Sequence, residues 1–138
     1  MEAIDRGYSL EQHVEGESRH LGASLLRLDL NQEREELLRD AVWATRGHVA
    51  KTLVKYPDLR VVLIALKQGQ SLGEHHTQAR FTVQTLTGRV LLKWGPQSVE
   101  LSQGCLLAME AGIPHDVEAL QESSFLLTLA WPAGHREA

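Results

Sequence analysis

The sequence predicts one all-β domain, a sandwich or barrel, preceded by an N-terminal helical extension. From about residue 48 onward, short runs rich in Val, Leu, Thr and Ile are separated by turn residues at intervals of roughly 8–12 residues, which is typical of all-β domains. The gaps leave no room for the crossover helices of parallel βαβ units. A length of 138 residues suits a single domain.

The first third of the chain differs from the rest in charge. Residues 1–40 carry ten acidic and five basic side chains, whereas residues 41–138 carry eight acidic and nine basic ones. Because forty residues cannot bury an adequate core alone, we interpret residues 1–45 as an acidic extension of the domain. The pattern of residues 1–28 fits either a helix or a strand.

A helix is expected over residues 31–44. Asp29 or Asn31 can cap its free amide groups, and Gln32 follows Asp29 by three residues, as in a capping box. Four apolar residues then share one helical face, which we expect to pack on the domain: Leu37, Leu38, Ala41 and Val42.

Beyond this helix we expect strands at approximately 48–56, 59–68, 72–76, 80–87, 89–95, 97–101, 105–109, 115–120 and 124–131. Gly88 and Gly104 lie in tight turns between strands, where a positive φ is often required. The strand at 124–131 is apolar on both faces, so it is either central in its sheet or covered by another chain.

Two stretches of this β region carry a recognisable order of glycines and histidines. Gly69 to Gly88 resembles the first cupin motif, and Gly104 to Ala119 resembles the second. The chain is thus similar to a small single-domain cupin of the RmlC-like kind. The resemblance implies a double-stranded β-helix, the cupin jelly-roll barrel, which encloses a ligand cavity. The barrel would cover residues 46–132, with a tail at 133–138.

The resemblance also bears on assembly. Residues Val61 to Leu66 are apolar on both faces, so either the N-terminal helix or another subunit must cover their outer side. Cupin-like proteins commonly dimerise through such strands, and we therefore expect a homodimer.

The metal-binding motif is degenerate. In metal-binding cupins the ligands are two His and one Glu from the first motif and one His from the second. His75 and His115 match the first and last of these positions, whereas Thr77 and Phe81 stand at the second His and the Glu. His76 is the candidate for a third ligand, but adjacent strand residues face opposite sides, so a bulge would be needed.

Three readings of the histidines stay open. With His75, His76 and His115 as ligands, the barrel would hold a divalent metal: zinc, nickel or copper, or iron, which usually needs a carboxylate as well. Alternatively, His75 and His115 bond to each other, water or backbone in an apolar cavity. In the third reading they bind an organic anion directly.

Further pocket candidates are Thr77, Phe81, Met109 and Glu110, of which Glu110 is expected near the cavity mouth. Cys105 has no local activating group, so we expect it to be a small core residue that shares a face with Met109.

Composition excludes several classes of function. A formal net charge of −4 without a basic run, together with 5% aromatic residues, argues against nucleic acid and anionic lipid as partners. One cysteine excludes an internal disulfide. No apolar run approaches the ~20 residues that span a bilayer, and the first residues do not resemble a signal peptide, so we expect a cytoplasmic protein without a membrane partner.

The predicted function is therefore binding of an unspecified small molecule in the barrel, with or without a divalent metal. The alternatives are a metal-dependent cupin enzyme of the dioxygenase or isomerase type, and a structural or partner-binding cupin domain without metal. Whether the protein is an enzyme is left open.

Overall fold

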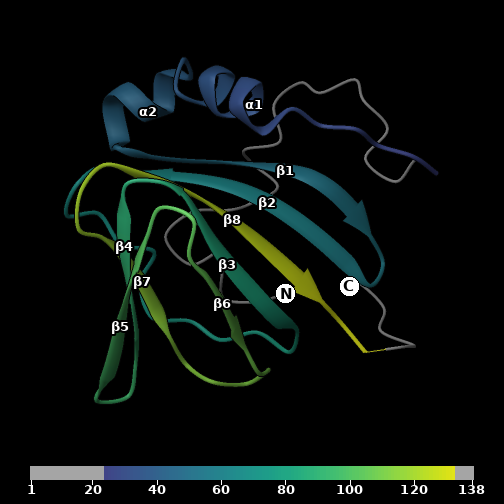
Figure 1. Cartoon of the computed structure of the whole chain (residues 1–138), viewed down its shortest axis with the longest axis vertical. Helices are drawn as coiled ribbons and strands as arrows, with labels where there is room; N and C mark the ends of the chain where they lie inside the picture. The colour runs from purple at the N-terminus through teal and green to yellow at the C-terminus, as the bar shows by residue number, and fades with distance from the viewer. Residues whose placement is uncertain (1–23, 133–138) are drawn as a thin grey trace.

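The computed structural model describes residues 24–132. In this part of the chain, eight strands form two antiparallel sheets (Figure 1). The five-stranded sheet has the order β1-β2-β8-β3-β6, and the three-stranded sheet has the order β5-β4-β7. The strands are β1 (His48–Tyr56), β2 (Leu59–Leu66), β3 (Arg80–Thr87), β4 (Arg89–Trp94), β5 (Gln97–Ser102), β6 (Leu106–Met109), β7 (Asp116–Ala119) and β8 (Ser123–Ala130).

The two sheets enclose the main hydrophobic core. Alternate residues of the strands turn inward, as the pleat of a β-strand requires. Strand β8 lies between β2 and β3, so the first of the two alternatives predicted for this strand, a central position in its sheet, is the one observed. The core includes Val62, Ile64, Leu66, Phe81, Val83, Val90, Leu92, Val117, Phe125, Leu127 and Leu129.

A second hydrophobic core lies on the outer face of the five-stranded sheet. Helices α1 (Leu30–Leu37) and α2 (Ala41–Arg46) cover this face over β1 and β2 (Figure 1). Leu37 and Trp43 belong to the same buried cluster as Leu63 and Ala65. The helical extension therefore covers the outward-facing residues of β2. The sequence analysis had left open whether a helix or another subunit covers them.

The single helix predicted over residues 31–44 is wrong, because the chain forms two short helices. Asp40 has an extended backbone, with φ −66° and ψ 139°, and its carboxylate accepts a hydrogen bond from Val42 N at 2.8 Å. Asp40 is thus the N-cap of α2, and α1 has already ended at Leu37. None of the helices in residues 24–132 is both long and apolar enough to cross a membrane.

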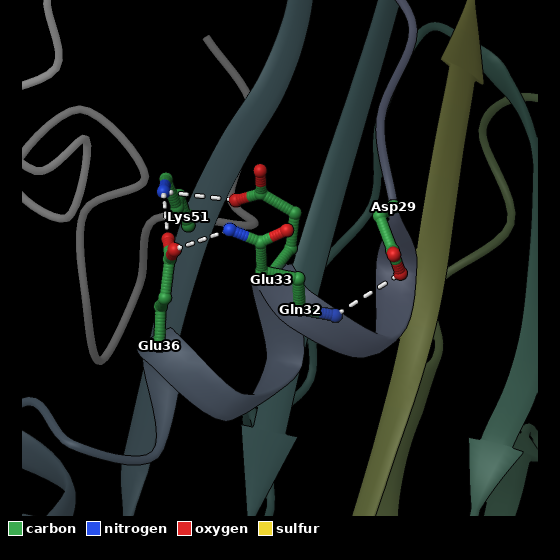
Figure 2. A network of polar contacts seen from close by, with 5 residues as sticks. All are labelled: Asp29, Gln32, Glu33, Glu36 and Lys51. Carbon is green, nitrogen blue, oxygen red and sulfur yellow. Dashed lines mark hydrogen bonds and ion pairs between the residues drawn. The ribbon is translucent and has the colours of Figure 1, made fainter.

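A buried ion pair attaches α1 to β1 (Figure 2). Lys51 Nζ lies 2.9 Å from Glu33 Oε1 and 3.7 Å from Glu36 Oε1. As predicted, Asp29 caps α1, since its carboxylate accepts from the amides of Asn31 and Gln32. The Gln32 side chain bonds Glu36 instead of returning to Asp29, so the reciprocal half of a capping box is not formed.

The strand predicted at 72–76 is also wrong. In place of a strand, two isolated antiparallel bridges are found here. Ser71 pairs with Glu118 in β7, and His75 pairs with His115, the residue just before β7. Gly73, with φ +84°, interrupts the extended backbone between them. The other predicted strands agree with the observed bounds to within two residues at each end. The positive φ expected at Gly88 and Gly104 is present, at 80° and 89°.

Candidate functional site: the His75–His115 pair

His75 and His115 come from separate segments and meet at an isolated bridge. His75 N donates to His115 O at 2.9 Å, and His115 N donates to His75 O at 2.8 Å. The two imidazole rings lie edge to face, with centroids 4.4 Å apart and an interplanar angle of 66°. Each residue is only 3% exposed. The reciprocal backbone bonds therefore bring two buried imidazoles into direct contact.

Backbone carbonyls orient both rings in the same way. Nδ1 of His75 lies 2.7 Å from Gly73 O, and Nδ1 of His115 lies 2.8 Å from Ile113 O. A carbonyl oxygen can only accept, so each Nδ1 carries the proton and donates it. In the neutral ring the acceptor nitrogen is then Nε2, which is the arrangement found in metal-ligating histidines.

Burial keeps His115 neutral. Its pKa is lowered from 6.5 to about 4, chiefly by desolvation and also by the nearby His75 and His76, against the opposing effects of the Ile113 carbonyl and Asp116. At neutral pH the Nε2 of this ring is consequently a hydrogen-bond acceptor and not a donor.

Next to the pair lies the apolar side chain of Phe81. The Phe81 ring lies against the His115 ring, with centroids 4.5 Å apart. Phe81 is paired with Met109 across β3 and β6, and both belong to the barrel core. Thr77 is buried as well, and its hydroxyl accepts a hydrogen bond from Ala79 N at 3.1 Å. Where the cupin motif has a carboxylate, the ring of His115 thus meets a phenyl group.

The remaining candidates lie apart from the pair. His76 is exposed between the buried His75 and Thr77. Glu110 is also exposed, and its carboxylate accepts a hydrogen bond from Arg80 Nε at 3.0 Å in a surface ion pair. Among residues 24–132, no three His, Cys, Asp or Glu side chains are grouped so that they could hold a metal ion.

The expectation that Cys105 is a core residue is wrong. Cys105 is exposed, because it ends a turn in which its amide donates to Ser102 O at 2.9 Å, just before the edge strand β6. Met109, at the far end of that strand, is buried.

The sequence reasoning missed the two carbonyls that orient the rings. Both belong to the residue two positions before the histidine, Gly73 before His75 and Ile113 before His115. The only available signal was this repeated spacing, since a backbone acceptor has no side chain that marks it in a sequence.

Comparisons with known proteins place this arrangement among solved folds. No protein-family model matches the sequence, and no curated protein matches it. A conserved protein of unknown function from Streptococcus pyogenes, SPY1581, has 23% identity and a TM-score of 0.66, covering 86% of this chain and 100% of that one.

Two further structures carry names that describe the fold or an activity. A cupin superfamily protein from Desulfitobacterium hafniense has 15% identity and a TM-score of 0.61, covering 63% of this chain and 80% of its own. Salicylate 1,2-dioxygenase from Pseudoaminobacter salicylatoxidans, solved with gentisate, has 12% identity and a TM-score of 0.70, covering 82% of this chain and 35% of the enzyme. Together with the jelly-roll strand order, these likenesses show that the chain is a small domain with the cupin fold.

Proposed function

We propose that this chain is a small-ligand-binding cupin domain, in which His75 and His115 contact the ligand in the barrel. The observation that carries the proposal is the pair itself: two buried imidazoles in contact, each oriented by a backbone carbonyl so that Nε2 is the acceptor. Burying polar groups costs free energy, and two apolar side chains would fill this place in the barrel without that cost. The presence of two oriented imidazoles therefore favours a binding role.

The protonation of the pair narrows the class of ligand. With a pKa of about 4, the His115 ring is neutral at pH 7 and offers a lone pair. Such a group accepts hydrogen bonds from hydroxyl or amide groups and does not attract an anion. We therefore propose a neutral ligand with hydrogen-bond donors, such as a polyol, in preference to an organic anion.

The side chains present do not fit a stably held metal ion. The tautomer is correct for metal binding, but the pair supplies two protein ligands, whereas stable sites usually use three or four. His76 is exposed to solvent and Phe81 has no donor atom, so neither residue supplies a third metal ligand beside the pair. A zinc, nickel, copper or iron ion would be held only weakly by His75 and His115, so the metalloenzyme alternative lacks support.

The partner-binding alternative depends on the acidic residues 1–28, most of which lie outside the described part of the chain. A homodimer and a cytoplasmic location are retained as parts of the proposal.

Ring-nitrogen NMR of ¹⁵N-histidine-labelled protein tests this function. Neutral polyols and sugars, acetate, and Zn²⁺ would be titrated separately at pH 7. We expect at least one polyol to shift the ring nitrogens of His75 and His115, and acetate to leave them unchanged. His76→Ala is the matched control and should respond like the unsubstituted protein, whereas His115→Ala should lose the response.

Two results would argue against the proposal. If no neutral compound shifts these nitrogens, or if the shifts persist in His115→Ala, the pair is not the ligand site. If Zn²⁺ binds tightly in a one-to-one complex that needs both histidines, the metal-free form is not the functional one.

A further inference from the structure

A cavity lies away from the histidine pair, between α1, the end of β3 and the start of β8. Its volume is about 210 Å³, and none of its residues belongs to the site described above. This volume would hold about seven waters at roughly 30 Å³ each, and it is smaller than the roughly 300 Å³ at which sites for drug-sized ligands begin. The lining residues are Arg34, Leu38, Thr87, Glu122, Ser123 and Ser124.

The hydroxyl groups of this cavity leave one hydrogen without an acceptor. Thr87 Oγ1 and Ser124 Oγ lie 2.7 Å apart, so one hydroxyl hydrogen forms the bond between them. Thr87 Oγ1 also accepts from Ser124 N at 3.1 Å. The second hydroxyl hydrogen of this pair is not used in a hydrogen bond among residues 24–132, and because Thr87 is half-buried it can donate to water or to a ligand in the cavity. A ligand oxygen in the cavity would satisfy it.

Two opposite charges line the same cavity without pairing. Arg34 extends from α1, and Glu122 precedes β8. Within residues 24–132, neither side chain forms a hydrogen bond or ion pair, with each other or with any third group. Elsewhere on this molecule, the surface charges Arg80 and Glu110 do pair, at 3.0 Å. The cavity therefore presents one cation and one anion that are both available to a ligand.

We propose that this cavity binds a small zwitterion, a free α-amino acid. Its carboxylate would accept hydrogen bonds from the Arg34 guanidinium and from the spare hydroxyl of the Thr87–Ser124 pair. Its ammonium group would donate to the Glu122 carboxylate. A simple anion would be repelled by Glu122 and a simple amine by Arg34, so a molecule that carries both charges matches the site best.

Titration of the full chain with L-alanine, followed by amide NMR, tests the proposal. Acetate, methylamine and inorganic phosphate serve as probes that carry a single kind of charge. We expect L-alanine and glycine to shift the amides of Thr87, Glu122 and Ser124 in a saturable way. We expect acetate and methylamine to bind at least about tenfold more weakly, because each loses one charge-assisted contact.

Substitutions then assign the two charges. Arg34→Gln and Glu122→Gln should each weaken L-alanine binding at least about tenfold, and Ser124→Ala should weaken it to a smaller extent. Arg39→Gln and Glu35→Gln are matched controls, since both are exposed charges near α1 that do not line the cavity. Thermal unfolding of every variant checks that the fold is retained, and Arg34→Lys keeps the charge if Arg34→Gln unfolds.

The proposal is overturned if L-alanine causes no saturable shift, or if Glu122→Gln leaves its affinity unchanged. It is also overturned if phosphate or acetate binds as well as L-alanine, which would make the cavity a plain anion site. These outcomes do not depend on the histidine pair, because neither histidine lines the cavity.

Discussion

The His115 imidazole is almost fully buried, and its Nδ1 is bonded to the Ile113 carbonyl, so that Nε2 is the acceptor nitrogen. Since burial lowers its pKa, this residue links protonation to the stability of the fold. The ring is neutral when folded, whereas in the unfolded chain it would gain a proton near its ordinary pKa of 6.5.

This linkage predicts a pH dependence with a definite sign. Between pH 6.5 and about 4 the unfolded chain binds more protons at this residue than the folded chain. The contribution of His115 to the free energy of unfolding is therefore complete above about pH 6.5 and decreases as the pH falls toward 4, by at most about 3 kcal/mol. Urea denaturation of the protein and of His115→Gln at several pH values measures the difference.

His76→Gln is the control for this experiment, because His76 is exposed and has the smallest of the effects on the His115 pKa, so the pH dependence should change little. If His115→Gln has the same slope as the unsubstituted protein over this range, the ring does not titrate as described.

At the scale of single residues, the sequence predicted which rings would meet but not how they would be held. The resemblance to the cupin motifs implied that His75 and His115 lie close together, and their rings are in contact. The carbonyls of Gly73 and Ile113 could not be predicted, since their direction depends on the backbone turn before each histidine. The exposure of Cys105 was missed because alternation alone does not tell where an edge strand begins.

At the scale of elements, α1 is held on the barrel by a charged contact as well as by apolar packing. The side chains of Lys51 and Glu33 are 6% and 10% exposed, so their ion pair is largely removed from water. Breaking a buried pair on one side leaves an uncompensated charge, which costs more than replacing both members.

We therefore predict that Glu33→Leu, which removes the nearest carboxylate of Lys51 and leaves Glu36 at 3.7 Å, destabilises the protein by up to about 3 kcal/mol. The double variant Glu33→Leu with Lys51→Met should recover most of this loss, because no charge stays buried. Urea denaturation of the single and double variants gives both values. Glu35→Leu on the exposed side of α1 should change the free energy of unfolding by no more than about 0.5 kcal/mol. Equal losses in the single and double variants would contradict this account.

The element boundaries show where local patterns are sufficient. Turn residues predicted most strands to within two residues, because a turn requires particular backbone angles that few residues adopt. The break between α1 and α2 was missed, although Asp40 is a good N-cap. An apolar stripe that continues through the break hid it, since both helices pack on the same sheet face.

At the scale of the whole molecule, one sheet separates two hydrophobic cores. The inner face of β2 belongs to the barrel core and its outer face to the helix-covered core. Neither core can lose its packing without exposing this sheet, so we expect the described part to unfold as one cooperative unit.

Leu63→Ala tests this coupling, because Leu63 is completely buried in the outer core. We predict a loss of about 2–5 kcal/mol in the free energy of unfolding. The midpoint should be the same by the indole NMR signal of Trp43, which reports the outer core, and by the NMR signals of His115, which reports the barrel. Leu106→Ala is the control, since Leu106 is 62% exposed and should change the stability by no more than about 0.5 kcal/mol. Two separate transitions in Leu63→Ala would show that the cores unfold independently.

The order of strands within the sheets depends on contacts between distant parts of the chain, which turn spacing alone does not determine. Strands β3 and β8 are neighbours although about forty residues separate them. Only the resemblance in the glycine and histidine motifs implied the jelly-roll arrangement, and the structure has that arrangement.

The bridge between residues 75 and 115 has a consequence for how this barrel can change. Its two hydrogen bonds join main-chain atoms, which every residue except proline provides at the amide. The scaffold at this point is thus independent of the side chains it displays. Substitutions at positions 75 and 115 other than to proline therefore keep these main-chain donors and acceptors, so that the side-chain chemistry displayed at the bridge can change while the backbone that positions it is retained.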